Sequence, residues 1–218
     1  ANAVGELLSG AVNPSGRTTD TFAYAVESAP SYYSIGAYNY TNCEWVNTSP
    51  IGGGAAPDFY HYVDYIEGIY VGYRYYETAA EDGFIDYDAT VQYPFGYGLS
   101  YTTFQYGDIV LNTPTMKQNE TITATIQVTN SGKYDGAEVV QLYIRDLVGS
   151  ITRPVRELKG FKKVFLKAGE SKTISFKITA DLLRFYDYDL NQVTEPGEFD
   201  IFIGGSSQAT KTARLTLK

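Results

Sequence analysis

Few residues of this sequence could act as a nucleophile or a general base. The only histidine is His61 and the only cysteine is Cys43. A serine or cysteine nucleophile needs a base within hydrogen-bond reach, and no Gly-x-Ser-x-Gly turn is present to expose such a serine. We therefore interpret His61, in "FYHYVDY", as a packed side chain. Cys43 lacks the companions that a zinc site requires and cannot form an internal disulfide.

Carboxylates are more numerous, and Asp58, Asp64 and Glu67 precede Gly72. Two carboxyl groups hydrolyse a glycosidic bond when they stand about 5 Å apart (retention) or about 6.5–9.5 Å apart (inversion). Nothing in the sequence pairs Glu67 with a second acid. We favour an ion pair with Arg74, or an exposed position, over a catalytic role for Glu67.

Residues 187–198, "DYDLNQVTEPGE", have some of the acid spacing of a calcium loop. The first, third, fifth and twelfth positions are Asp187, Asp189, Asn191 and Glu198. The sixth position should be glycine but is Gln192, and strand patterns flank the segment where helices are required. We interpret it as a hairpin turn. "GIYVGY" and "GGG" likewise lack the setting that would hold a phosphate, so the sequence predicts no cofactor and no metal.

Charge divides the chain near residue 104. Residues 1–104 carry two basic and twelve acidic residues, a net charge of −10, whereas residues 105–218 carry fifteen basic and thirteen acidic residues, a net charge of +2. Sixteen of the 21 tyrosines precede residue 105. The shift indicates a domain boundary. The total of −8 argues against nucleic-acid binding, because phosphate recognition needs a cationic surface.

The second part has the pattern of a β-sandwich. Alternating segments at 121–129, 138–146, 172–178, 198–205 and 213–218 are separated by turn residues. About seven short strands without a convincing helix are typical of an immunoglobulin or fibronectin III sandwich, and the missing cysteine pair favours the second. The basic stretch 153–172 is interpreted as a solvated strand face that discourages edge pairing, rather than as a site for an anionic partner or a contact with the acidic first part.

The first part predicts too few elements for a complete domain. The spacing of Val4, Leu7, Leu8 and Ala11 predicts an opening helix, and a strand is expected over 18–26. Residues 27–60 form a long loop rich in tyrosine and glycine. The alternation in "EGIYVGYRYYE" (67–77) predicts a buried strand with a close backbone approach at Gly72. One helix and two strands cannot close a layered core, so we expect partners from elsewhere and regard the chain as a fragment.

The stretch "YPFGYGLSYTTF" (93–104) places five rings at the boundary. Each aromatic ring can bury about 150–250 Å². We expect Phe95, Tyr97, Tyr101 and Phe104 to form a hydrophobic joint that docks the sandwich on its neighbour.

These motifs together resemble the C-terminal region of family 3 glycoside hydrolases, the β-glucosidase and β-xylosidase group. The resemblance rests on "VNPSGRTTDTF", "YIEGIYVGYRYYE", "YPFGYGLSYTTFQY", "VVQLYIRD", "ITRPVRELKGFKKVFLKAGESKTISF", "LRFYDYD" and "EPGEFDIFIGGSS". It implies that residues 1–104 close an α/β sandwich domain, with 27–60 as an inserted loop and 93–104 as the joint. Residues 105–218 would form the fibronectin III-like domain. The fold expected is mostly β, a β-sandwich preceded by a partial α/β sandwich segment.

The resemblance implies a retaining glycosidase whose catalytic residues lie elsewhere. The family's nucleophile motif resembles Ser-Asp-Trp and its acid/base motif resembles Glu-Gly-x-Asp-Arg, and neither occurs in this sequence. No catalytic residue is therefore carried over. Trp45, in the 27–60 loop, is the expected substrate-stacking residue, against the alternative that the loop's rings pack on their own domain. The alternative function is an independent carbohydrate- or protein-binding module.

The partners implied are the remaining barrel and α/β sandwich polypeptide of the same enzyme, and a β-linked oligosaccharide or glycoside. The sequence favours neither a monomer nor a homo-oligomer. No run of about 18 apolar residues predicts a membrane span. The sequence contains no signal-peptide pattern, and a single cysteine slightly favours a cytoplasmic location.

Overall fold

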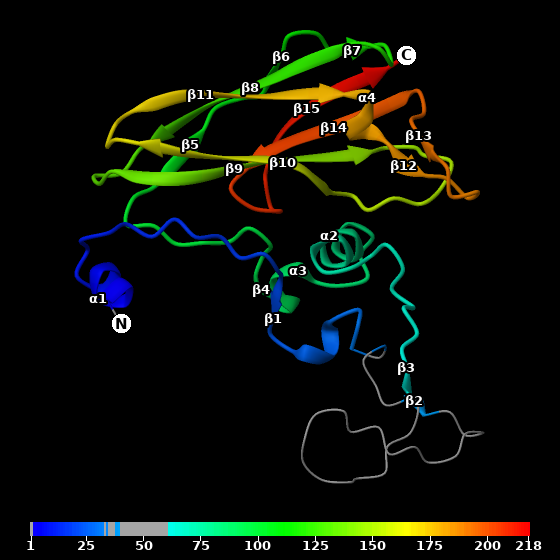
Figure 1. Ribbon diagram of the computed structural model, residues 1–218, viewed down its shortest axis with the longest axis horizontal. Helices are drawn as coiled ribbons and strands as arrows, with labels where there is room; N and C mark the ends of the chain where they lie inside the picture. The colour runs from blue at the N-terminus through cyan, green and yellow to red at the C-terminus, as the bar shows by residue number, and fades with distance from the viewer. Residues whose placement is uncertain (1, 33, 35–37, 40–60) are drawn as a thin grey trace.

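A two-sheet β-sandwich dominates the computed structural model and confirms the mostly β fold class (Figure 1). The structure describes residues 2–32, 34, 38, 39 and 61–218. Figure 1 shows the sandwich at the top, with the elements of the first part along one side of it. The described parts of the chain up to residue 103 add no strand to either large sheet.

The larger sheet has the strand order β10-β9-β14-β15-β7, in which only the β15–β7 pair is parallel. The smaller sheet has the order β11-β8-β5, and β6 also pairs with β8. The bounds are β5 Phe104–Tyr106, β6 Val110–Leu111, β7 Thr115–Met116, β8 Thr121–Asn130, β9 Gly136–Asp146, β10 Glu157–Leu166, β11 Ser171–Thr179, β14 Gly197–Gly204 and β15 Lys211–Leu217. The five predicted alternating segments are therefore confirmed within about two residues.

The core fills the space between the two sheets, because each long strand turns alternate side chains inward. In β8 the inward side chains are almost fully buried: Ile122, Ala124, Ile126 and Val128. The inward residues of the opposite sheet meet them: Val140, Leu142, Ile144, Phe199, Ile201, Ile203, Leu215 and Leu217. Burial of each large side chain stabilises the fold by roughly 1.5–3 kcal/mol, so this core is the main source of stability in the sandwich.

Strand β9 differs from its neighbours because its outward face is also covered. Gln141 is 3% exposed and Tyr143 is fully buried, although both point away from the sandwich core. The first part supplies the covering residues. Gln141 and Tyr143 therefore mark where the two parts of the molecule meet.

The remaining sandwich elements are short. Helix α4 (Ala180–Leu183) is a single turn, and β12 (Phe185–Tyr186) pairs with β13 (Gln192–Val193). The Asp187 carboxylate accepts hydrogen bonds from the backbone N–H groups of Asp189 and Asn191, at 2.9 and 2.8 Å. This local bonding is typical of a turn, and the predicted hairpin is confirmed.

The first part consists of short elements. Its helices are α1 (Asn2–Leu8), α2 (Tyr73–Glu81) and α3 (Tyr87–Thr90), and a 3-10 turn spans Val26–Ser28. Strand β1 (Phe22–Ala23) pairs with β4 (Val91–Tyr93), and β2 (Tyr38–Asn39) pairs with β3 (His61–Tyr62). The opening helix is confirmed, whereas the strand expected over 18–26 is reduced to two residues.

The prediction of a buried strand over 67–77 is wrong, since helix α2 begins at Tyr73. Tyrosines and aliphatic residues occupy odd and even positions alike in this segment, so its alternation fitted either structure. The spacing of Tyr73, Tyr76 and Ala79 places all three on one helical face, and Tyr76 and Ala79 are buried. Gly72 precedes the helix with φ of +55°, a conformation that favours glycine.

Candidate functional site

The best-defined site of the described residues is the contact between the first part and the outward face of β9. Helix α2 lies beside the larger sheet (Figure 1). The Tyr73 ring lies 4.5 Å from the Phe95 ring and 6.0 Å from the Tyr143 ring, measured between centroids. The Tyr73 hydroxyl accepts a hydrogen bond of 2.8 Å from the backbone N–H of Leu158 in β10. One tyrosine of α2 thus contacts β9, β10 and the 93–104 stretch.

Gln141 packs against the backbone of the same stretch, where its Nε2 lies 3.5 Å from the carbonyl oxygen of Gly96. Its Nε2 donates to the carbonyl of Gly205 at 2.6 Å, and its Oε1 accepts from the Tyr143 hydroxyl. Gly96 has φ of +82°, and a Cβ placed there would lie 2.4 Å from Gln141 Oε1. The backbone N–H of Ser207 donates to the carbonyl of Phe95 at 2.9 Å. The positive φ and the close approach of Gln141 both favour glycine at position 96.

The other rings of the 93–104 stretch have different surroundings. Phe104 packs against the sandwich core. Tyr97 stacks on Tyr93, with the ring centroids 4.8 Å apart. Tyr101 is 48% exposed, and its hydroxyl donates to the carbonyl of Leu7 in α1 at 2.6 Å. The four expected joint residues therefore contact four different places: α2, Tyr93 of β4, α1 and the sandwich core.

A buried ion pair also spans the two parts. Arg17 Nη2 donates to Glu138 Oε2 at 2.5 Å, and the Tyr106 hydroxyl donates to Glu138 Oε1 at 2.9 Å. The side chains of Arg17 and Glu138 are 12% and 4% exposed. Burial raises the pKa of the Glu138 carboxyl, against the lowering effects of Arg17 and Tyr106. The same burial, with the Glu138 charge, raises the pKa of Tyr106.

A second polar group connects α2, α3 and the loop after β14. Glu77 is 5% exposed and accepts hydrogen bonds from the Tyr87 hydroxyl and from Gln208 Nε2. Burial and then the neighbouring Glu77 raise the pKa of Tyr87, so Tyr87 stays a neutral donor. No described nucleophile and base stand together in either polar group, so both are positioned to hold the parts together.

An apolar groove of about 630 Å³ lies on the other side of α2. Ile66, Tyr70, Ala79, Phe84 and Ile85 are among the residues that line it. Its acidic lining residues are Glu27, Glu67 and Asp82. Phe84 is 80% exposed, which is a large apolar area for a surface ring.

Three residues considered for chemistry lie outside the described residues: Cys43, Trp45 and Asp58. His61 belongs to β3. The Glu67 carboxylate accepts a hydrogen bond of 2.9 Å from Ser34 Oγ, and among the described residues no ion pair joins Glu67 to Arg74. Within the same residues, no group of three or more His, Cys, Asp or Glu could hold a metal ion.

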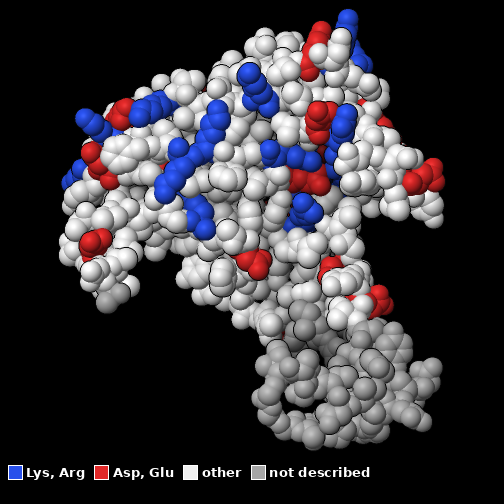
Figure 2. All heavy atoms as spheres, viewed as in Figure 1, with Lys and Arg blue, Asp and Glu red and all other residues white. Residues whose placement is uncertain are grey.

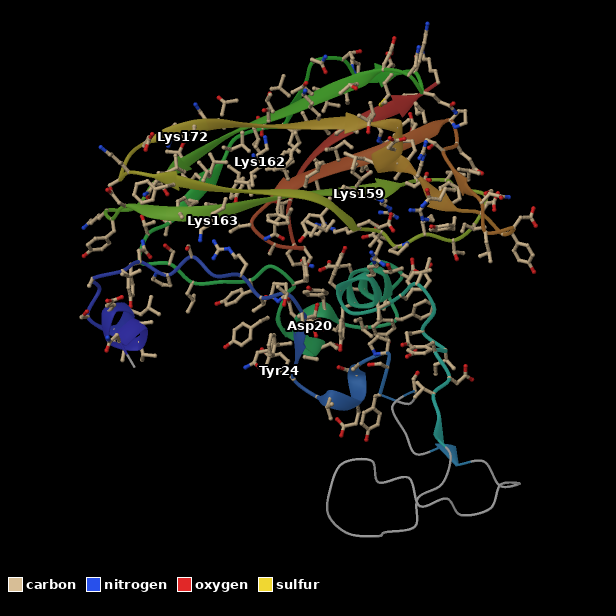
Figure 3. The ribbon with its side chains drawn as sticks, viewed as in Figure 1. Asp20, Tyr24, Lys159, Lys162, Lys163 and Lys172 are labelled. Atoms are coloured by element: carbon tan, nitrogen blue, oxygen red, sulfur yellow. The ribbon has the colours of Figure 1, made fainter. Side chains whose placement is uncertain are left out.

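The basic stretch 153–172 includes the whole of β10. Figure 2 shows Lys and Arg gathered over the sandwich. Lys162 Nζ of β10 donates to the carbonyl of Ser175 in β11, at 2.5 Å. Lys172 Nζ of β11 donates to the carbonyl of Phe165 in β10, at 2.7 Å. Figure 3 shows both lysines where these two edge strands lie side by side. We call this pair the lysine clamp.

Arginines of the same stretch also have partners inside the molecule. Arg156 Nη1 donates to the carbonyls of Ser207 and Ala209, and Arg153 donates to Glu157. Burial raises the pKa of Glu157, but Lys159 and Arg153 outweigh it and lower the pKa overall. These contacts agree with a structural interpretation of the basic stretch.

Sequence reasoning missed most of the contact region. The alternation in 67–77 predicts a strand at Tyr73, which is wrong. Arg17 and Glu138 lie 121 residues apart, so no local pattern reveals that they pair. One signal was available, because the outward positions of 138–146 include valine, glutamine and tyrosine instead of a uniformly charged set. A strand with two moderately apolar faces is typically covered on both.

No helix of the described residues has both the length and the apolar composition needed to cross a membrane.

Comparison with protein families identifies residues 138–207 as a fibronectin type III-like domain. Along nearly its whole length the chain resembles the periplasmic β-glucosidase of Salmonella typhimurium, with 38% identity over 99% of this chain and 24% of that protein. A β-xylosidase of Formosa agariphila is 50% identical over 60% of this chain and 18% of its own length.

Solved structures give the same result. The GH3 β-glucosidase of Bifidobacterium adolescentis superposes with a TM-score of 0.77 at 34% identity, over 99% of this chain and 28% of that one. The β-glucosidase of Kluyveromyces marxianus in complex with glucose gives 0.79 at 30% identity, over 100% of this chain and 22% of that one. The chain thus spans about a quarter of the length of the curated relatives it matches, and by these likenesses it belongs to the family 3 glycoside hydrolases.

Proposed function

We propose that this chain is the non-catalytic C-terminal section of a retaining β-glucosidase or related exo-glycosidase, and that it scaffolds the catalytic domains. The relatives named above are β-glucosidases and a β-xylosidase that extend well beyond the matched region. The sequence contains neither catalytic motif of the family.

The observation that carries the proposal is the incomplete core of the first part. Of the 24 large hydrophobic side chains exposed among the described residues, sixteen lie between Val4 and Tyr101. Helix α1 has no buried residue, although a seven-residue helix is marginal in water without tertiary contacts. Tyr24, labelled in Figure 3, is 63% exposed. Such a surface is expected where further polypeptide of the same protein packs.

The apolar groove beside α2 belongs to this surface. We propose that the groove receives an apolar segment of the remaining polypeptide. The acidic groups that line it, Glu27, Glu67 and Asp82, favour a segment flanked by basic residues. Burial of the Phe84 ring alone would contribute up to about 3 kcal/mol.

We propose the domain division 1–104 and 105–218, with 93–104 as the joint. The Tyr73–Phe95–Tyr143 stack and the Arg17–Glu138 pair would then set the orientation of the sandwich relative to the catalytic domains. A buried ion pair contributes mainly when both partners are present, because one left alone is strongly destabilising. The scaffolding role depends on this fixed relation.

The finer parts of the proposal concern substrate, assembly and location. Trp45 is proposed to stack on a sugar of a β-linked glycoside at the rim of the active site, and Trp45→Ala in the full-length enzyme should raise KM. Light scattering of that enzyme tests whether it is a monomer or a homo-oligomer. The proposed cytoplasmic location is tested by cell fractionation, and the name of the Salmonella relative gives the competing location, the periplasm.

The central test measures hydrolysis of aryl β-glucosides and β-xylosides. The purified chain should show no turnover by itself, and co-expression with the rest of its gene product should restore activity. Turnover by the chain alone, free of contaminating enzyme, would overturn the proposal.

Two matched variants test the groove in the co-expression assay. Phe84→Ser should lower the restored activity at least about tenfold, because it removes an apolar contact worth more than 1.4 kcal/mol. Tyr188→Ser, at a 92% exposed position in the β12–β13 hairpin, should leave it unchanged. Equal effects of the two changes would contradict the assignment of the groove.

A further inference from the structure

A cleft of about 570 Å³ lies between the end of α1 and the loop that joins β8 to β9. Tyr101 and Tyr134 line it, together with Leu8, Asn13 and Asp135. We call it the tyrosine cleft. Its volume falls in the range of about 300–1,000 Å³ that ligand sites occupy. Tyr101 also belongs to the proposed joint, whereas the Tyr73–Phe95–Tyr143 stack and the Arg17–Glu138 pair lie outside the cleft.

The cleft presents two aromatic rings to solvent. Tyr101 is 48% exposed and Tyr134 is 62% exposed. Among the described residues the Tyr134 hydroxyl has no hydrogen-bond partner, whereas the Tyr101 hydroxyl is held by the carbonyl of Leu7. Exposed tyrosines offer an apolar face beside a polar tip, a combination that is common at binding surfaces.

Both rings are carried by a fixed backbone. Asn13 Oδ1 accepts from the backbone N–H of Tyr101 at 2.8 Å, and Asn13 Nδ2 donates to the carbonyl of Asp135 at 2.9 Å. Asn130 is fully buried, and its Nδ2 donates to the carbonyl of Tyr134 at 2.8 Å. Two asparagines thus hold the walls of the cleft before any ligand arrives, which lowers the entropic cost of binding.

The polar groups of the cleft favour a neutral ligand rich in hydroxyl groups. Asp135 is exposed, and its Oδ1 accepts one hydrogen bond, from the backbone N–H of Ala168 at 2.9 Å. The carboxylate keeps further acceptor capacity for hydroxyl donors. It disfavours anions, as does the net charge of −10 on residues 1–104. Because the cleft is also polar, a purely apolar ligand would leave buried acceptors unpaired.

We propose that the tyrosine cleft binds the pyranose rings of a neutral oligosaccharide. The C–H face of a pyranose stacks on Tyr134 and Tyr101, and its hydroxyl groups donate to Asp135. The cleft is a binding site without catalysis. This proposal concerns the chain itself, so failure of the scaffolding test leaves it standing.

The test titrates the 218-residue chain with cellotetraose and follows amide chemical shifts by NMR. Saturable shifts are expected at residues of the cleft. Tyr134→Ala should weaken binding about tenfold, since stacking on one of the two rings is lost. Tyr188→Ala, at an exposed tyrosine outside the cleft, is the matched control and should bind as the unchanged chain does.

Three outcomes would overturn the proposal. The first is no saturable shift at the cleft, and the second is equal binding by Tyr134→Ala and Tyr188→Ala. The third is binding of tetragalacturonate as tight as that of cellotetraose, because an anionic sugar should be rejected by Asp135. Asp135→Asn should reduce the difference in affinity between cellotetraose and tetragalacturonate. This result would separate the effect of the Asp135 charge from the effect of stacking on the tyrosines.

Discussion

The sandwich and the first part use their hydrophobic residues in opposite ways. In the sandwich, 18 buried residues form one continuous cluster between two sheets. In the described residues of the first part, the buried hydrophobic residues are only Tyr76, Ala79 and Val91. The sandwich therefore has the core of an independently stable domain, whereas the first part is held mainly by its contact with the sandwich.

The difference explains why polar groups dominate the contact between the parts. Two small surfaces cannot bury enough apolar area to fix an orientation, and hydrogen bonds supply direction. Three side chains bond across the contact: Gln141 donates to the carbonyl of Gly96 at 3.5 Å, Glu138 accepts from Arg17, and Glu77 accepts from Gln208. Each such bond contributes about 0.5–1.5 kcal/mol, but losing one partner of a buried group costs more.

The largest difference in stability is expected when one leucine in each part is replaced by alanine. Leu142→Ala removes a side chain that is 1% exposed and should lower the free energy of unfolding by about 2–5 kcal/mol. Leu8→Ala changes a residue of α1 that is 81% exposed and should alter it by no more than about 0.5 kcal/mol. Urea unfolding of both variants measures the contrast, and similar losses would show that the first part has a core of its own.

A smaller effect is expected at the contact itself. Tyr73→Ala removes the stack with Phe95 and the hydrogen bond from Leu158, and should cost about 2 kcal/mol. Tyr73→Phe keeps the ring and should cost about 1 kcal/mol. Hydrogen exchange should show α2 losing protection in Tyr73→Ala while β8 keeps it.

The control for this experiment is Tyr65→Ala, at a 75% exposed position of the first part. It should leave exchange in α2 unchanged. If Tyr73→Ala also leaves the protection of α2 and the small-angle scattering profile unchanged, the contact does not hold the parts together.

The smallest effect is expected in the pH dependence of the free energy of unfolding. Burial raises the pKa of Glu138 in the folded state, so the folded protein keeps this proton at pH values where the unfolded chain, with a pKa of about 4.3, has lost it. The contribution of Glu138 to stability therefore falls as pH rises from about 4.3 through the raised folded value.

The side chain in Glu138→Gln does not titrate. Glu157 and the other carboxyls are present in both proteins, so their effects cancel in the comparison. Urea unfolding between pH 4 and pH 7 should show the unchanged chain losing stability relative to Glu138→Gln as pH rises. If the stability of the unchanged chain relative to Glu138→Gln stayed constant or grew with pH, Arg17 would lower the pKa of Glu138 by more than burial raises it.

The local alternation of apolar and polar residues predicted the strands of the sandwich correctly, but it gave the wrong structure at the contact region. In 121–129 apolar and polar residues alternate strictly, and β8 follows that pattern. In 67–77 tyrosines occupy both faces, so the helical spacing from Tyr73 to Ala79 was hidden. Contacts such as Tyr73–Phe95 and Arg17–Glu138 depend on pairings distant in sequence, which no local period encodes.

The lysine clamp has a practical consequence for handling this protein. Lys162 and Lys172 donate to backbone carbonyls across the two neighbouring edge strands, β10 and β11. A foreign strand that tried to extend either sheet there would meet two ammonium groups. Reagents that acylate lysines, as in covalent attachment to a solid support, would remove both positive charges and weaken this protection of the sheet edges.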